Sequence, residues 1–398
     1  MTRLPNVVAA EPIPEEAAEA VRTLLESGDL FRYTSGARSP VALLEREFAE
    51  MIGARYALAV SSCSAALFLS LRALDLAPGA RVLVPAFTFA AVPSAVVHAG
   101  CSPVLVNVGA DYRIDLDDFR RRLDDGADAV LISHMRGHTS DMDAISSACA
   151  ARGLALVEDA AHSLGTTWRG RPIGTLGAVG CFSFQSYKLL NAGEGGMLIT
   201  DDADLIARAV VMSGAYEDNW RKHPVVGDRC AAWRDRLPLY NVRLNNLSAA
   251  IVRAQLKEVP RRVADGRRNH DHAAARLSAE PWFDVPAALP GEARAPDSIQ
   301  FNIVGVGDDA LVRRFTQAAD ARGLNIQVFG LSDGNARAFW NWRFLPRQAG
   351  LKPTKAMLRR ACDVRLPARL SLDEVDTIVD VVIAAANETL ATAIGSAA

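Results

Sequence analysis

The sequence has no large excess of either charge. Its 398 residues include 44 Lys plus Arg and 46 Asp plus Glu, which gives a formal net charge of −2. Because nucleic acid and anionic membranes attract strongly basic surfaces, this balance gives no reason to expect either partner. The most apolar stretch, residues 86–97, is too short to span a membrane and contains Pro93.

Cysteines are few for this length, and they are not arranged in pairs. The six are spread along the chain without a CxxC spacing, which argues against a zinc site and against a disulfide framework. We therefore expect no metal and a reducing compartment. The first residues lack the basic-then-apolar pattern of a signal peptide, because prolines and glutamates interrupt them. These features together predict a cytoplasmic protein.

Short apolar runs alternate with helical patterns along the first part of the chain. Helical stretches such as 64–73 and 142–152 lie between the runs. This alternation predicts an α/β fold with a mostly parallel sheet covered on both faces, and such sheets bind ligands at the carboxyl ends of their strands. The predicted strands are residues 56–60, 81–85, 104–108, 129–133, 155–158 and 197–200.

The pattern changes after a helix predicted over residues 245–259, which Pro260 ends. We predict a smaller α+β unit beyond it and small, polar last residues that fray from about Thr389. The predicted organisation is an N-terminal segment over 1–20, a large domain over 21–259 and a small C-terminal domain over 260–398. The elements expected in the last of these are strands at 299–306 and 325–329 and helices at 309–322 and 371–386.

Two motifs carry residues suited to chemistry. A predicted strand ends at Glu158 and Asp159, where a carboxylate can cap a loop or meet a cationic nitrogen of a ligand. Lys188 follows an aromatic, hydroxyl-rich run and precedes a Gly-rich turn. A lone lysine is usually a solvated surface residue, but desolvation by apolar neighbours would lower its pKa and make it a nucleophile for carbonyls. With Ser183 as a hydrogen-bond donor to a phosphate, these residues match the requirements of a pyridoxal 5′-phosphate (PLP) site.

With these motifs the sequence resembles the DegT/DnrJ/StrS family of PLP-dependent sugar and aminocyclitol aminotransferases. Residues 158–162 match its Glu-Asp-Ala-Ala-Gln/His pattern, and residues 182–196 match its Phe-Ser-Phe, Lys and Gly-Glu-Gly-Gly pattern. The resemblance is strong over residues 20–260 and weak beyond them. It implies the PLP-dependent transferase fold type I, which is aspartate aminotransferase-like, with a mostly parallel central sheet and a smaller α+β C-terminal domain.

The resemblance also implies roles for individual residues. Lys188 would form the Schiff base with PLP and move the proton, and Asp159 would pair with the pyridinium nitrogen. His162 would lie near the phenolic oxygen of PLP, with a satisfied buried histidine as the alternative. Ser183 would bind the phosphate.

The turn at residues 62–67 resembles the phosphate-binding turn of the family. It places Cys63 where glycine is usual, Ser64 where threonine is usual, and Ala65 beside them. Backbone amides at a helix start suit a phosphate, although Ser64 could instead be an ordinary helix cap. Phe89 is the candidate for stacking on the pyridine ring, with a core role as the alternative. Glu194 is expected to hold the Gly-rich turn by accepting backbone N–H bonds.

Three further expectations concern a partner subunit and the acceptor. The resemblance implies a homodimer in which Asn241 reaches the cofactor phosphate of the partner, with Arg243 close by. The segment 335–345 is rich in aromatics, and it could be either a packed surface helix or a wall of the acceptor pocket. In the second case Arg337 or Arg343 would pair with a carboxylate or phosphate.

The function expected from these residues is a PLP-dependent transamination. An amino group would pass from L-glutamate or L-glutamine to a keto group of a sugar, nucleotide-sugar or cyclitol in a biosynthetic pathway, such as that of an amino sugar or an antibiotic. One alternative is a PLP-dependent keto-deoxysugar dehydratase, although a histidine replaces the lysine in the best-known branch. Another is a non-catalytic binding or regulatory protein, which the intact Asp159, Ser183 and Lys188 argue against.

Overall fold

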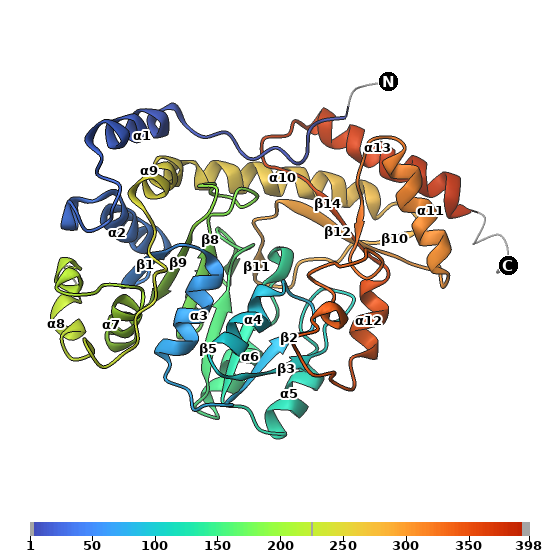
Figure 1. The fold of residues 1–398 in the computed structure, drawn as a ribbon. Coiled ribbons are helices and arrows are strands. Elements are labelled where there is room, and N and C mark those ends of the chain that lie inside the picture. Colours follow the sequence, from blue (N-terminus) through green and yellow to red (C-terminus); the bar gives the residue numbers. More distant parts are fainter. Residues whose placement is uncertain (1–3, 224–225, 392–398) are drawn as a thin grey trace.

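A seven-stranded sheet forms the centre of the computed structural model, which describes residues 4–223 and 226–391 (Figure 1). The strands follow the order β1-β9-β8-β5-β4-β2-β3. All run parallel except β9, which is antiparallel to both of its neighbours. The strands are β1 (Tyr56–Val60), β2 (Arg81–Pro85), β3 (Ser102–Val106), β4 (Ala129–Ser133), β5 (Ala155–Asp159), β8 (Val179–Ser183) and β9 (Gly196–Thr200).

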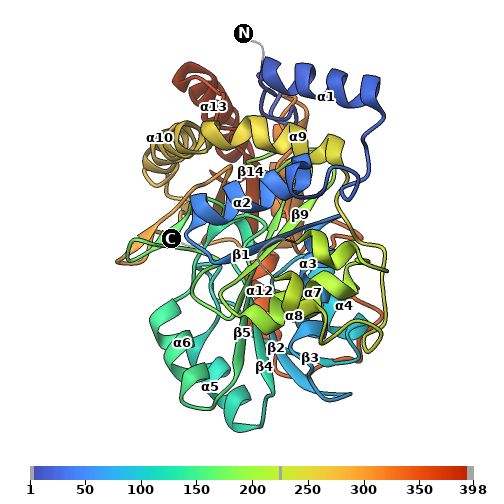
Figure 2. The same ribbon diagram turned by 90° about the vertical axis from the view of Figure 1, so that its left-hand side faces the viewer.

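Helices cover both faces of this sheet (Figure 2). Along β2, Val82 and Val84 pack into the cluster under one set of helices, whereas Leu83 packs into the cluster under the other set. This explains why the strands read as continuous apolar runs, since neither face meets water. One face carries α3 (Cys63–Ala73), α4 (Ala91–His98), α7 (Ala203–Met212) and α8 (Gly227–Cys230), and the other carries α2 (Pro40–Ile52), α5 (Leu116–Asp124) and α6 (Met142–Ala150).

The C-terminal part contains an antiparallel four-stranded sheet in the order β10-β12-β14-β13. Its apolar core includes Phe301, Phe315 and Ile378. A capping box formed by Ser371 and Glu374 begins the last helix. The elements are α10 (Val259–Leu277), β10 (Phe283–Asp284), β12 (Ser298–Ile303), α11 (Asp309–Asp320), β13 (Gln327–Val328), α12 (Lys352–Leu358), β14 (Ala361–Arg365) and α13 (Leu372–Thr389).

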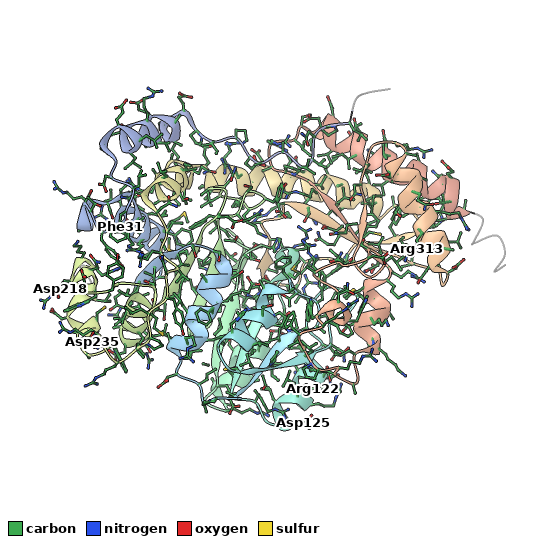
Figure 3. The ribbon with its side chains drawn as sticks, viewed as in Figure 1. Phe31, Arg122, Asp125, Asp218, Asp235 and Arg313 are labelled. Atoms are coloured by element: carbon green, nitrogen blue, oxygen red, sulfur yellow. The ribbon has the colours of Figure 1, made fainter. Side chains whose placement is uncertain are left out.

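Shorter elements connect these parts. Side chains fill the space between the layers, and Phe31 lies at the opposite end of the molecule from Arg313 (Figure 3). The remaining elements are α1 (Glu15–Ser27), α9 (Asn246–Gln255), the 3₁₀ turns η1 (Gly36–Arg38), η2 (Met135–Gly137), η3 (Asn219–Lys222), η4 (Leu256–Glu258) and η5 (Phe339–Asn341), and a small sheet of β6 (Thr167–Trp168), β7 (Arg171–Pro172) and β11 (Glu292–Ala293).

The predicted α/β architecture is confirmed, with local differences. Three predicted strands coincide with β1, β2 and β4, whereas β3 begins two residues before the predicted strand. The prediction that Pro260 ends the helix over 245–259 was wrong, because α9 ends at Gln255 and Pro260 lies in the first turn of α10, where its missing N–H costs nothing. The helix α13 reaches Thr389, and residues 392–398 of the predicted fraying tail lie outside the described residues. The proposed boundaries near residues 20 and 260 stay predictions.

Candidate active site

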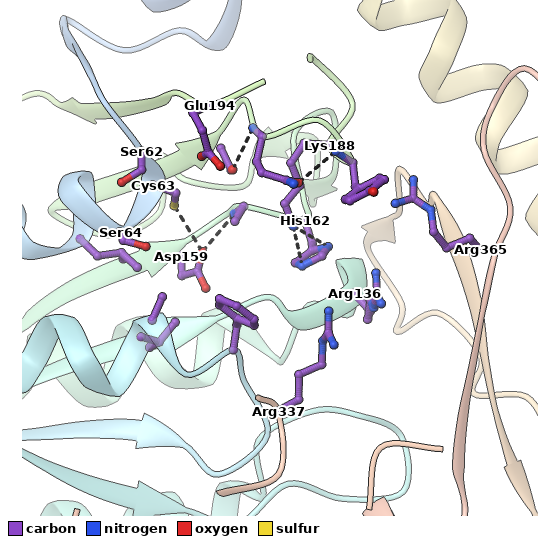
Figure 4. Close-up of a pocket in the computed structure, with 18 of the residues that line it drawn as sticks. Ser62, Cys63, Ser64, Arg136, Asp159, His162, Lys188, Glu194, Arg337 and Arg365 are labelled. Atoms are coloured by element: carbon purple, nitrogen blue, oxygen red, sulfur yellow. Dashed lines mark hydrogen bonds between the residues drawn. The ribbon is translucent and has the colours of Figure 1, made fainter. Parts of the chain in front are cut away.

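A cavity of about 650 Å³ lies at the carboxyl ends of the central strands (Figure 4). The turns after β1, β4, β5 and β8 all contribute to its wall, as expected for an open parallel sheet. Its size suits a small ligand, since such sites measure roughly 300–1,000 Å³. Eight of the residues selected from the sequence line it, namely Cys63, Ser64, Phe89, Asp159, His162, Ser183, Lys188 and Arg337.

The two adjacent carboxylates at the end of β5 have different surroundings. Glu158 is fully buried, and its side chain accepts N–H bonds from Leu176 and Gly177 at 2.6 Å each and from Gly174 at 2.9 Å. It therefore holds the loop before β8. Asp159, one residue later, lines the cavity instead, because successive side chains of a strand point to opposite faces.

Asp159 carries a buried carboxylate bonded only to neutral donors. Ser133 donates to Oδ2 at 2.7 Å, and the amide of Ala161 donates to Oδ1 at 3.1 Å. The thiol of Cys63 lies 3.8 Å from Oδ1. Within the described ranges Asp159 forms no ion pair, so a cationic group of a ligand is the partner that would best stabilise its charge.

Lys188 points its amine into the same cavity. The Nζ atom lies 2.8 Å from Nε2 of His162. Burial lowers the Lys188 pKa to about 8, and the nearby Arg136 guanidinium acts in the same direction. Burial also holds the pKa of His162 well below its usual range, so this ring is neutral and can accept a hydrogen bond from the ammonium. A larger fraction of this amine is therefore neutral and nucleophilic at neutral pH than in an ordinary lysine.

The turn after β1 starts α3 at the other end of the cavity. Ser62 is the helix cap and accepts the amide hydrogen of Ala65 at 3.1 Å. The alternative role of Ser64 as the cap was therefore wrong, and its exposed hydroxyl lines the cavity. Ala65, also predicted to bind the cofactor, is buried and does not line the cavity, and its amide donates to this cap. The amides of Cys63 and Ser64 occupy the first turn, where a helix leaves N–H groups available for an anion.

The Gly-rich turn packs directly against the start of α3. A Cβ at Gly196 would lie 2.3 Å from the carbonyl carbon of Ser62, so no side chain fits there. The expectation that Glu194 holds this turn was wrong, because its side chain is exposed and accepts no hydrogen bond in the described structure. Asn191 holds the turn instead, since its Oδ1 accepts the Gly193 amide hydrogen at 2.9 Å.

Phe89 is a cavity aromatic and not a core residue. Its side chain is 45% exposed and lines the cavity, where a ring-shaped ligand could stack on it. The guanidinium carbon of Arg337 lies 5.7 Å from the centre of its ring. Arg337 also donates to Oε1 of Gln327 at 3.2 Å.

Besides Ala65, three predicted site residues do not line the cavity. Asn241 is exposed, in a segment whose residue Val242 accepts the amide hydrogen of Ser61 beside the α3 turn. Arg243 instead donates to the Gly214 carbonyl at 2.7 Å. Arg343 is exposed and does not line the cavity, so the expectation that it could line the acceptor pocket was wrong.

Two arginines of the cavity wall, Arg136 and Arg365, were not predicted from the sequence. Arg136 follows β4, in a left-handed conformation with φ of 57° that is unusual for a residue other than glycine. A search of the turn after every predicted strand would have found it. Arg365 ends β14, a strand that the sequence analysis did not predict.

Comparison with known proteins decides the family. Residues 12–383 match the DegT/DnrJ/EryC1/StrS aminotransferase family. The chain belongs to this family. The match extends further into the C-terminal part than the motifs had indicated, and the expected fold class is confirmed.

Relatives in this family act in the biosynthesis of amino sugars and aminocyclitols. The chain is 35% identical over 66% of its length to the spore coat polysaccharide biosynthesis protein SpsC of Bacillus subtilis, and it covers 66% of that protein. It is 29% identical to GDP-perosamine synthase of Caulobacter vibrioides, with 87% of this chain and 89% of the relative covered. It is 35% identical to L-glutamine:scyllo-inosose aminotransferase of Streptomyces griseus, with 61% and 58% covered.

Solved structures agree with this assignment. 3-Amino-5-hydroxybenzoic acid synthase aligns with a TM-score of 0.83 at 25% identity, over 97% of this chain and 100% of that one. An Escherichia coli GDP-4-keto-6-deoxy-D-mannose-3-dehydratase with PLP shares the fold at 22% identity and a TM-score of 0.81, covering 96% of this chain. The fold alone therefore does not separate the two chemistries. The family model and the named relatives describe aminotransferases, and the chain is a PLP-dependent aminotransferase.

Two further findings concern membrane-spanning helices and the cysteines. No helix in the described ranges is both long and apolar enough to cross a membrane. The six cysteines, all within these ranges, are free and buried.

Proposed function

We propose that this enzyme moves the amino group of L-glutamate or L-glutamine to a keto group of a sugar, nucleotide-sugar or cyclitol in a biosynthetic pathway. The observation that carries the proposal is the meeting of the Lys188 amine and the Asp159 carboxylate in one cavity. The named products and substrates of the relatives support the class of acceptor. The retained Lys188 disfavours a dehydratase.

The cavity residues fit PLP. Asp159 has no cationic partner among the described residues, and a pyridinium nitrogen would supply one. Ser64 and Ser183, with the first amides of α3, would hold the phosphate, while Phe89 would cover one face of the ring. When bound, PLP supplies an electron-accepting ring that stabilises negative charge on the carbon next to the transferred nitrogen.

The protein residues would then share the remaining work. Lys188 Nζ would hold the cofactor covalently, leave when the donor amine replaces it, and take the proton from the α-carbon of the donor. His162, at 2.8 Å, would orient this amine. Asp159 would keep the ring nitrogen protonated, because its charge stabilises a neighbouring cation.

A homodimer in the cytoplasm completes the proposal. Asn241 would reach the phosphate site of the partner subunit, and Arg243 would stand beside the same interface. Two facts support this: Asn241 is exposed, and its neighbour Val242 pairs with Ser61 beside the phosphate-binding turn. Phe31 and Tyr216, both 40% exposed, flank Arg243 at 5.4 and 5.1 Å and would be covered by a second copy.

The test is the visible absorbance of the purified protein with added PLP, before and after L-glutamate or L-glutamine. We expect a yellow band that one of the donors bleaches. Lys188→Ala should form no such band, whereas Lys352→Ala, which removes an exposed lysine, should behave as the parent. A band that neither donor bleaches would contradict the transamination from these donors, and no band at all would contradict the enzyme assignment.

A further inference from the structure

Three arginines from distant parts of the chain meet on one side of the cavity. Arg136 follows β4, Arg337 belongs to the aromatic segment, and Arg365 ends β14. Figure 4 shows them on the side of His162 and Lys188. All three line the same cavity as His162 and Lys188.

The charges of these arginines are only partly balanced. Arg136 forms an ion pair with Asp363, and Arg365 lies 4.0 Å from Asp297. Arg337 has only a neutral side-chain partner, Gln327, among the described residues. Burial, assisted by Arg136, lowers the Arg337 pKa to about 10, and the more weakly acting Asp363 and Asp297 do not offset it.

The phosphate of the cofactor does not account for these arginines. The turn that suits a phosphate starts at Ser62, and Figure 4 shows Ser62, Ser64 and Asp159 across the cavity from the arginines. The arginines are instead on the side of the Lys188 amine, where the reacting carbon of a substrate must come. A guanidinium binds carboxylate and phosphate groups in a bidentate geometry.

We propose that Arg136, Arg337 and Arg365 form an anion-binding site for a carboxylate or phosphate group of the keto acceptor. The acceptor is then an anionic keto compound, and a neutral keto-sugar or cyclitol binds more weakly. This inference rests on the proposed transamination, because it takes the Lys188 side of the cavity as the place of the reacting carbon.

The test measures binding without turnover. The PLP-loaded enzyme is titrated calorimetrically with 3-oxocyclohexane-1-carboxylate and with its uncharged amide, and separately with inorganic phosphate. We expect the carboxylate to bind at least tenfold more tightly than the amide. Arg337→Ala should weaken the binding of the carboxylate about 10- to 100-fold and the binding of the amide less than threefold. Arg337→Lys should recover part of the loss, and Arg347→Ala, an exposed arginine of the next segment, should change neither.

The same variants separate the possible sources of the anion. If inorganic phosphate binds more tightly than the carboxylate, the result would indicate a phosphorylated acceptor. Equal binding of carboxylate and amide, or no binding of the carboxylate or phosphate, would overturn the inference. The inference would also be overturned if Arg337→Ala left carboxylate binding unchanged but slowed the bleaching by L-glutamine and not that by L-glutamine α-amide. The arginines would then bind the carboxylate of the donor. Failure of the parent enzyme to form the yellow band with PLP would instead contradict the proposed function.

Discussion

The consecutive carboxylates of Glu158 and Asp159 serve opposite sides of strand β5. Glu158 accepts three backbone N–H bonds from the loop before β8, whereas Asp159 faces the cavity. One side chain thus fixes the loop, and its neighbour is available to a ligand. Substitutions at the two positions should therefore have different consequences.

Glu158→Gln should lower the free energy of unfolding by about 2–4 kcal/mol. The amide group would point an N–H at backbone donors that now meet a carboxylate, which leaves buried groups unpaired. Asp159→Asn should change the thermal midpoint little and slow the donor half-reaction by about 10²–10⁴-fold. Thermal denaturation and stopped-flow absorbance measure both effects. The reverse pattern would contradict the division of roles.

The reaction of the cofactor-free protein with PLP should depend on pH through Lys188. Burial is the main cause of its lowered pKa of about 8, and Arg136 acts in the same direction, while Asp297, Asp159 and Cys63 act against it. Only the neutral amine attacks a carbonyl, so the rate should rise about tenfold per pH unit below pH 8 and level off above it. Nα-acetyl-lysine, with an ordinary pKa, should continue to rise beyond pH 9.5. A protein rate that also continues to rise would contradict this account.

Removing a neighbouring cation should shift this pH profile to higher pH. Arg136→Ala deletes a positive charge that disfavours the Lys188 ammonium and leaves the carboxylate of Asp363 unpaired. Both changes favour the protonated amine, so the plateau should begin at a higher pH. The exposed Arg347→Ala is the control, and its profile should match that of the parent. A downward shift for Arg136→Ala would be inconsistent with the charge arrangement.

Gly196→Ala should disturb the phosphate-binding turn. Its Cβ would lie 2.3 Å from the Ser62 carbonyl carbon and 2.5 Å from the Cys63 nitrogen, so β9 and α3 must separate. We expect a loss of about 1–3 kcal/mol in stability and a weaker affinity for PLP, measured by fluorescence titration. Gly307→Ala is the matched control, because a Cβ there meets nothing within 4 Å. Equal affinities in the two variants would show that the close contact is not needed.

The large sheet could be predicted because its strands are buried on both faces. Runs such as 129–133 are continuously apolar, and their ends mark where the cavity residues lie. The helix α10 was missed because charged residues dominate it, with Arg261, Arg267 and Arg268 on its surface. Its apolar positions are too few to show a clear helical period.

The cavity was predictable only in part. Motifs in which the residues are close in the sequence, such as those around Asp159 and Lys188, could be recognised directly. The pairing of Arg136 with Asp363 joins residues 227 positions apart, and no local spacing predicts it. The role of Asn241 depends on a second copy of the chain, so neither the sequence nor one protomer tests it.

The central claim is that Lys188 is the residue that holds the cofactor. The direct measurement is reduction of the PLP-loaded protein with borohydride, followed by proteolysis and mass spectrometric mapping of the modified peptide. The account predicts a single pyridoxyl group on Lys188. A pyridoxyl group on another lysine, or none on any peptide of a protein that has formed the yellow band, would contradict it.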